Sequence, residues 1–159
     1  MLDDSGRVEI SFSEKQANFS FDNIFVITRL ISGDFPPFDR LFNEEKTIFA
    51  EVNAKDFLQA IERVAVIARV ADYEVVKLNF ADNEIKISAT SPDVGNAEEV
   101  VTAEITGGEL QISFNHNYLV DALKVAGDNV KIGLSESLKP VTCQFEDFQY
   151  IVTPVRTKD

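Results

Sequence analysis

The sequence predicts an α+β fold in which a unit of one strand, one helix and three strands occurs twice, with both helices on one face of antiparallel sheet. Three observations predict this class. Residues 53–61 resemble residues 115–123, which lie 62 positions further along the chain. Both stretches carry an apolar stripe at helical spacing, and the stretches around them alternate apolar and polar residues as strands do. Two such units together have the size of one ordinary domain.

The expected elements follow the same order in both halves. The first half is predicted to contain a strand at 48–52, a helix at 54–69 and strands at 75–81, 84–89 and 98–106. The second half is predicted to contain a strand at 110–114, a helix at 116–126 and strands at 130–134, 141–145 and 149–155.

Both helices have a predicted start and a predicted buried face. Asn53 and Asn115 stand at the N-cap positions, where a side-chain oxygen accepts a hydrogen bond from an unpaired amide of the first turn. The apolar stripes are Phe57, Leu58, Ile61, Val64, Ala65 and Ala68 in the first helix and Leu119, Ala122, Leu123 and Ala126 in the second. Each helix therefore has one face to bury against sheet.

The N-terminal part is predicted to form strands without a helix. Apolar and polar residues alternate over 7–13, 17–22 and 24–31, and no helical stripe precedes them. Such a sheet leaves apolar positions poorly covered unless another chain covers them, and exposed patches of this kind drive association. The side chains concerned are Phe19, Phe21 and Phe25.

These N-terminal strands resemble the end of the chain. Residues 8–13, 16–21 and 26–30 match 130–135, 140–145 and 151–155, at offsets of 122, 124 and 125. Gly33 and the prolines at 36 and 37 then break the strand pattern. We therefore expect residues 1–33 to be the last strands of a truncated domain, residues 34–46 a connector and residues 47–159 a complete domain. On this reading the chain is a fragment, and Met1 is an introduced or an internal start.

Composition and charge exclude several classes of protein. No apolar run approaches the ~18 residues that cross a bilayer, and no signal peptide is recognisable. The lone cysteine, Cys143, allows no internal disulfide and is expected to be buried on a strand. A net charge of −12 argues against a simple basic nucleic-acid binder, although the helix at 54–69 sums to +1. Either a ring with a neutral or basic inside or an ordinary acidic domain would have this distribution.

No catalytic or cofactor-binding constellation is present in the sequence. His116, the only histidine, is expected on the exposed first turn of the second helix, with no second histidine or cysteine to share a metal. The acidic pairs are expected on the surface. Gly107 and Gly108 form a predicted turn with no helix start to hold a phosphate. We therefore expect no enzyme activity, no metal and no cofactor.

Two segments carry more apolar residues than a loop or a chain end usually does. Residues 35–42 contain three aromatic side chains, and residues 150–156 form a rigid apolar stretch with one proline. If the two segments meet, they would form a groove for a short apolar peptide. The alternative is that both simply pack on the sheet. Composition alone does not separate these two readings.

Three motifs give the chain a resemblance to a known family. They are TRLISGDFPPF at 28–38, ISFNHNYLVDAL at 112–123 and YIVTPVR at 150–156. Over its whole length the sequence resembles the bacterial replicative sliding clamps, the beta subunits of DNA polymerase III. The resemblance implies the DNA-clamp fold, with residues 1–33 from the middle domain and 47–159 as the third domain.

The family also implies a function and partners. Its members are non-catalytic cytoplasmic processivity factors, which close head to tail into a dimeric ring around duplex DNA after loading by a clamp loader. DNA polymerase and repair proteins dock through short apolar motifs in a groove between the second and third domains. The other reading is an acidic β-rich interaction module with no nucleic-acid role, and peptide binding separates the two.

The resemblance also implies site residues. Those of the peptide groove are Pro36, Arg40, Leu41, Tyr73, Asn115, Tyr118, Leu138, Pro140, Ile151, Val152, Thr153, Pro154, Val155 and Arg156. Those of the protomer interface are Ile67, Ala68, Glu98 and Glu99. Thr153 stands where many relatives carry methionine, and residues 157–159 extend past the usual terminus.

Overall fold

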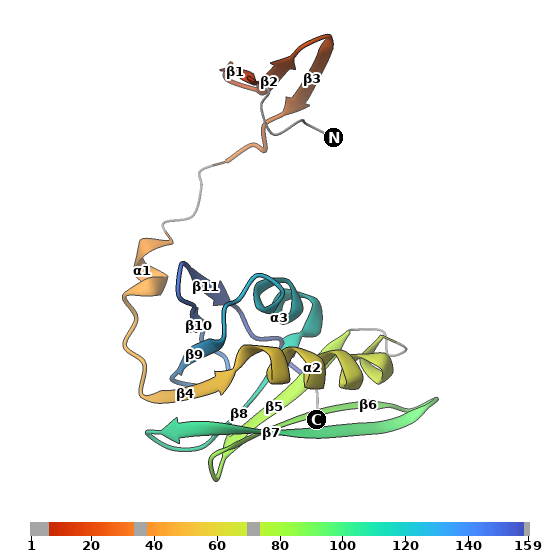
Figure 1. Ribbon diagram of the computed structural model, residues 1–159, viewed down its shortest axis with the longest axis vertical. Helices are drawn as coiled ribbons and strands as arrows, with labels where there is room; N and C mark the ends of the chain where they lie inside the picture. The colour runs from red at the N-terminus through yellow and green to blue at the C-terminus, as the bar shows by residue number, and fades with distance from the viewer. Residues whose placement is uncertain (1–6, 34–37, 70–73, 158–159) are drawn as a thin grey trace. The chain divides into compact units, whose positions relative to one another are not determined.

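The structure, a computed structural model, describes residues 7–33, 38–69 and 74–157. The chain divides into two compact units, Met1–Pro37 and Phe38–Asp159 (Figure 1). The division falls within the segment where the prolines interrupt the strand pattern. Each unit has its own sheet, and the second unit carries the larger core.

The first unit is a three-stranded antiparallel sheet in the order β1-β2-β3. Its strands are β1 (Glu9–Phe12), β2 (Gln16–Phe21) and β3 (Ile24–Arg29), so the predicted three strands are confirmed. Ile10 lies opposite Phe19, and Phe19 lies opposite Val26, so one face of this sheet is apolar. The predicted apolar side chains of this unit are poorly covered, as expected. Phe25 is 75% exposed, while Phe19 and Phe21 are only half-buried.

The second unit contains an eight-stranded antiparallel sheet in the order β11-β10-β9-β4-β7-β6-β5-β8. Its strands are β4 (Ile48–Asn53), β5 (Val75–Ala81), β6 (Glu84–Ser91), β7 (Gly95–Thr106), β8 (Leu110–Asn115), β9 (Asn129–Leu134), β10 (Val141–Gln144) and β11 (Gln149–Val152). The long strand β7 joins the two halves, because its first part pairs with β6 and its last part with β4. Gly107 and Gly108 follow β7 with positive φ, and a side chain at Gly107 would collide with the carbonyl of Thr47.

Two helices cover one face of this sheet, as predicted. Helix α2 (Ala54–Ala68) packs on β4, β5, β6, β7 and β9, while α3 (His116–Leu123) packs on β8 and β11. The two helices also contact each other and lie next to one another over the sheet (Figure 1). Both predicted caps are present: Asn53 Oδ1 accepts from the amide of Asp56 at 3.1 Å, and Asn115 Oδ1 accepts from that of Asn117 at 2.9 Å.

Both helices are shorter than predicted. Helix α2 ends at Ala68 instead of residue 69, and α3 ends at Leu123 instead of residue 126. The chain turns after α3, where the amide of Ala126 donates to the carbonyl of Leu123 at 3.2 Å. Arg69 is the C-cap of α2, so two basic and two acidic residues lie within the helix and the third basic residue lies at its end.

The sequence analysis missed one helix. A single turn, α1 (Asp39–Phe42), lies inside the expected connector at 34–46. No side chain caps its start, which is why the sequence carries no helix signal there. The rings of Phe38 and Phe42 pack edge to face across the turn, with their centres 6.2 Å apart.

Strand pairing confirms the resemblance between β1–β3 and β9–β11 and corrects its register. Ile132 pairs with Cys143 and Cys143 with Tyr150, just as Ile10 pairs with Phe19 and Phe19 with Val26. Val26 therefore corresponds to Tyr150, at an offset of 124. The sequence match at offset 125 was wrong by one position, which in a strand exchanges the two faces.

Candidate functional site

The C-terminal segment connects the two ends of the large sheet. Strand β11 pairs with β10, and the chain then continues past Val152 as residues 153–157 without regular structure. The amide of Val155 donates a hydrogen bond to the carbonyl of Ser113 on β8, at 2.8 Å. Since β8 and β11 are the two edge strands, this bond carries the segment from one edge to the other. Residues 153–156 therefore lie against β8, just before α3 begins.

The first turn of α3 contributes the next part of the surface. Asn115 uses its side chain as the helix cap, and Tyr118 is 53% exposed. Tyr118 and Asp121 lie close to Tyr150 on β11, and burial together with these neighbours raises the pKa of the Tyr150 hydroxyl. Helix α3 and the C-terminal strand thus meet at a partly apolar, partly hydroxylated surface.

The hairpin between β9 and β10 contributes a third part. Leu138 at its tip is 52% exposed, and Pro140 at its end is half-buried. The segment before β4 holds this hairpin at both ends. The amide of Thr47 donates to the carbonyl of Leu134 at 2.9 Å, and Lys46 Nζ donates to the carbonyl of Pro140 at 2.7 Å.

The structure brings together most, but not all, of the predicted groove residues. Ile151, Pro154 and Val155 are half-buried, and Thr153 and Arg156 are exposed along the C-terminal segment. Val152 is 3% exposed, so its side chain belongs to the core beneath the surface. Arg40 and Leu41 lie on α1, exposed and half-buried respectively. Pro36 and Tyr73 lie outside the described residues.

The expectation that His116 is exposed was wrong. The side chain has no exposed surface, although it occupies the first turn of α3. Its Nδ1 lies 3.0 Å from the carbonyl oxygen of Glu74, so Nδ1 carries the proton and donates it, and Nε2 accepts from Arg69 Nε at 3.4 Å. Both ring nitrogens are thereby engaged within the protein, and neither is left for a metal or a substrate.

Glu74 explains why this histidine is buried. Its backbone has a φ of 50°, and its carbonyl accepts from both the amide and the ring of His116. Its carboxylate also accepts from Asn117 Nδ2 at 2.6 Å. Because Val75 pairs with Asn115, the start of β5 lies against the start of α3. This contact comes from strand pairing between distant segments, and no local sequence signal indicates it.

The predicted protomer-interface residues already make contacts within this chain. Ala68 is 1% exposed and lies in the core, whereas Ile67 is half-buried beside it. Glu98 pairs with Lys86 at 2.8 Å. The Glu99 carboxylate accepts bidentate hydrogen bonds from Arg63 at 2.9 and 3.0 Å, and this contact holds the pKa of the Glu99 carboxyl below its usual range.

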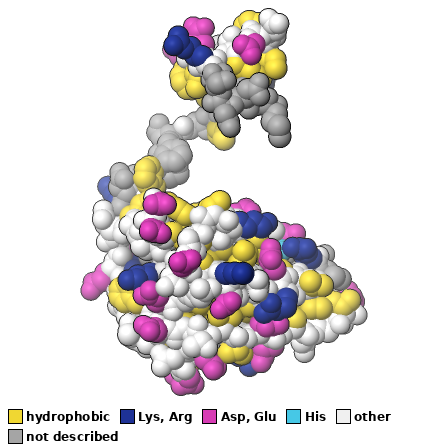
Figure 2. Space-filling view, viewed as in Figure 1, with side chains coloured by type: hydrophobic (Ala, Val, Ile, Leu, Met, Phe, Trp, Pro, Cys, Tyr) yellow, Lys and Arg dark blue, Asp and Glu magenta, His cyan; other side chains and the backbone are white. Residues whose placement is uncertain are grey.

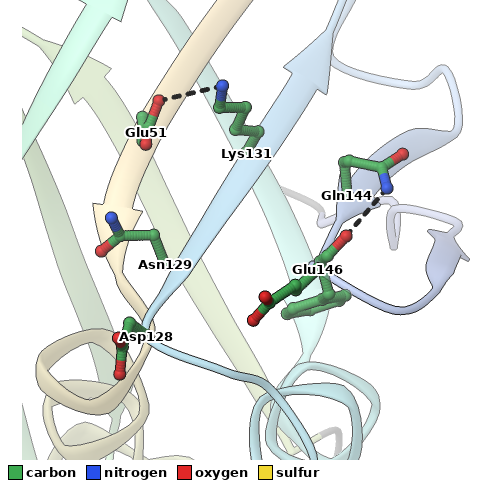
Figure 3. A pocket seen from close by; sticks show the side chains of 7 residues that line it. Glu51, Asp128, Asn129, Lys131, Gln144 and Glu146 are labelled. Atoms are coloured by element: carbon green, nitrogen blue, oxygen red, sulfur yellow. Dashed lines mark hydrogen bonds and ion pairs between the residues drawn. The ribbon is translucent and has the colours of Figure 1, made fainter.

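A separate hollow of about 370 Å³ opens beside β4, β9 and β10 (Figure 3). It is lined by Glu51, Asp128, Asn129, Lys131, Gln144, Phe145 and Glu146. Lys131 Nζ pairs with Glu51 at 3.5 Å, and Gln144 Nε2 donates to the carbonyl of Phe145 at 2.8 Å. None of the predicted groove residues lines this hollow.

Nothing among the described residues indicates bond-making chemistry. They contain no group of three or more His, Cys, Asp or Glu side chains that could hold a metal ion. Cys143 is buried as predicted, and burial raises the pKa of its thiol to about 12. No helix in the described part of the chain is long and apolar enough to cross a membrane. Figure 2 shows acidic and basic side chains intermixed over the visible face of the larger unit.

Comparison with known proteins shows that the chain is similar to bacterial sliding clamps. The chain is 35% identical to the beta sliding clamp of Staphylococcus epidermidis, over 99% of this chain and 43% of that protein. It is 34% identical to the DNA polymerase sliding clamp from Bacillus subtilis, with a TM-score of 0.80 and coverage of 99% of this chain and 43% of that one. The sliding clamp of Bartonella birtlesii, solved bound to griselimycin, is 29% identical with a TM-score of 0.80, over 94% of this chain and 41% of that one.

The chain thus spans less than half the length of these relatives. The family match nevertheless falls within its second unit. Residues 39–156 match the model of the DNA polymerase III beta subunit, C-terminal domain, from the first residue of α1 to the end of the segment that docks on β8. The chain therefore belongs to the DNA polymerase III beta subunit family.

Proposed function

We propose that this chain is part of a DNA sliding clamp, in which its second unit supplies one wall of a peptide-binding groove. The supporting observation is the convergence of three segments. The C-terminal segment docks on β8 through Val155, the first turn of α3 presents Tyr118, and the β9–β10 hairpin presents Leu138. Two half-exposed side chains, Tyr118 and Leu138, beside a C-terminal segment that contains Pro154 suit an apolar peptide motif.

The whole protein, on this proposal, encircles duplex DNA as a homodimeric ring and tethers DNA polymerase and other proteins that carry the motif. A clamp loader would place the ring on DNA in the cytoplasm. The protein itself would perform no catalysis, because its role is topological. We assign residues 1–33 to the last strands of the family's second domain, residues 34–46 to the connector and residues 47–159 to the third domain.

The helix charges support a role that depends on ring closure rather than on direct affinity for DNA. Helix α2 and its C-cap Arg69 together carry a charge of only +1, and Arg63, one of their three basic side chains, is already paired with Glu99. A protein that neutralises few phosphates releases few counterions and binds DNA weakly. Retention on DNA would then come from encirclement. Ile67, Glu98 and Glu99 remain our proposed protomer contacts, with Ala68 supporting them from the core.

The alternative is an acidic β-rich interaction module with no nucleic-acid role. Peptide binding tests the proposal. The chain should be titrated with griselimycin, which the Bartonella birtlesii clamp binds, and with a peptide carrying an apolar Leu-Phe anchor, while backbone amide chemical shifts are followed. We expect shifts at Tyr118, Leu138 and Thr153 with micromolar or weaker affinity for the peptide. No shift at millimolar concentration of either ligand would overturn the proposal and leave the plain interaction module.

A further inference from the structure

The lysine in front of β4 is unusually enclosed. The side chain of Lys46 is only 6% exposed, although the residue belongs to a connecting segment where lysines usually extend into water. Its Nζ lies 2.7 Å from the carbonyl oxygen of Pro140 and 3.6 Å from Glu44 Oε2. A buried ammonium group needs such partners, because an unpaired charge inside a protein is costly.

Gly133 makes room for the stem of this lysine. A Cβ atom built at Gly133 would lie 2.7 Å from Thr142 Oγ1, closer than real contacts allow, and 3.0 Å from Lys46 Cγ, which is a tight contact. Gly133 is buried on β9, one residue before the end of that strand, and it pairs with Phe49 on β4. The absent side chain thus leaves room for the stem of Lys46 on its way to the carbonyl of Pro140.

Consecutive residues of the connecting segment hold the two ends of this hairpin. Thr47 binds Leu134, the last residue of β9, and Lys46 binds Pro140, the residue before β10. Between these two points the loop has one internal backbone bond, from the amide of Lys139 to the carbonyl of Glu136 at 3.1 Å. Leu138 lies in this stretch and is half-exposed. Its position therefore depends on how firmly the loop ends are fixed.

We propose that Lys46 is a positioning residue for the peptide-binding surface, which fixes the β9–β10 hairpin so that Leu138 and Pro140 face the ligand. This inference rests on the proposed function of that surface. Lys46 itself need not touch the peptide, because its ammonium group is enclosed by Glu44 and Pro140. Its effect on affinity arises from keeping the loop in the binding conformation, so that less order has to be imposed when the ligand binds.

The test compares three variants of the whole chain. Lys46→Met retains the unbranched stem that lies over Gly133 but removes the donor, and Lys46→Arg retains a donor for the carbonyl of Pro140. Lys131→Met is the matched control, because Lys131 also pairs with a glutamate, Glu51 at 3.5 Å, but lies 68% exposed on β9 beside the separate hollow. Thermal unfolding of each variant establishes that affinities are compared on folded protein.

Two measurements separate a positioning role from a purely structural one. Without ligand, amide hydrogen exchange over residues 135–139 should become faster in Lys46→Met, with little change over α2. With griselimycin or the Leu-Phe peptide, affinity should fall roughly 5- to 10-fold, which corresponds to about 1 to 1.4 kcal/mol. Lys46→Arg should restore most of both effects, and Lys131→Met should show neither.

The possible outcomes are distinguishable. If the unmodified chain binds neither ligand, the proposed function fails. If the unmodified chain binds and Lys46→Met binds equally well while remaining folded, the positioning role is refuted and the proposed function stands. An equal loss of affinity in Lys46→Met and Lys131→Met would also refute it, since the effect would then follow from loss of a positive charge anywhere on this domain.

Discussion

Replacing Leu138 with alanine tests the candidate surface most directly. Leu138 is 52% exposed at the tip of the β9–β10 hairpin, so about half of its apolar surface is available to a ligand. Complete burial of a leucine side chain is worth about 1.5 to 3 kcal/mol. Covering the exposed half should therefore contribute about 0.8 to 1.5 kcal/mol to binding, and Leu138→Ala should weaken it roughly 4- to 12-fold.

The same exposure predicts a small effect on stability. The exposed half of the side chain contributes little to folding, so the free energy of unfolding should fall by about 1 kcal/mol or less. Val100→Ala is a suitable control, because Val100 is 49% exposed on β7 and belongs to none of the three segments of the surface. It removes a similar apolar area elsewhere on the same sheet.

Isothermal titration calorimetry with griselimycin and with the Leu-Phe peptide measures both variants against the unmodified chain. The expected pattern is a loss of affinity for Leu138→Ala and none for Val100→Ala. Equal affinities for Leu138→Ala and the unmodified chain would show that the ligand does not cover this hairpin. The groove would then have to be assigned to other residues, and the role of Lys46 would lose its basis.

Three further predictions follow from the same structure. The buried thiol of Cys143 should stay unreactive toward thiol reagents until the protein unfolds. Because folding raises the pKa of this thiol from 9.0 to about 12, its ionisation should leave the free energy of unfolding unchanged below pH 9 and lower it between pH 9 and pH 12, as measured by urea unfolding at each pH. Fluorescence anisotropy should show binding of linear duplex DNA weaker than about 100 μM at physiological salt, and tight binding would contradict the charge argument. The chain should self-associate through the apolar face of its first unit, and Phe12→Glu, at a side chain 73% exposed, should lower the association constant roughly tenfold in light-scattering measurements, whereas a strictly monomeric unmodified chain would disprove this.

The regular part of the second unit was predictable from the sequence because its signals are local. An asparagine cap marks the start of each long helix, an apolar stripe marks its buried face, and period-two alternation marks the strands. Cys143 was correctly placed in the core by this alternation, between Val141 and Phe145. The helix ends were less certain, since no glycine or proline stops α2 at Ala68.

The candidate surface was only partly predictable because its hydrogen bonds join distant segments. Lys46 and Pro140 are 94 residues apart, and nothing in the connecting segment marks that lysine as buried. His116 could have been placed from the sequence, because it lies three and seven positions before Leu119 and Leu123 and so shares their buried face of α3. Its hydrogen-bond partner could not, since the carbonyl that receives its proton belongs to the distant Glu74, which precedes β5.

These long-range bonds have a consequence for how the surface forms. The C-terminal segment needs β8 in place, the hairpin needs the segment before β4, and the first turn of α3 needs Glu74. Each partner is itself fixed by pairing within one continuous sheet, from β11 at one edge to β8 at the other. No single hairpin or helix can therefore present the surface alone. Binding should therefore appear only when the whole second unit is folded. Phe80 lies on β5, fully buried in the core and outside the three segments of the surface. A large-to-small change at Phe80 should nevertheless weaken binding in proportion to the fraction of unfolded chain.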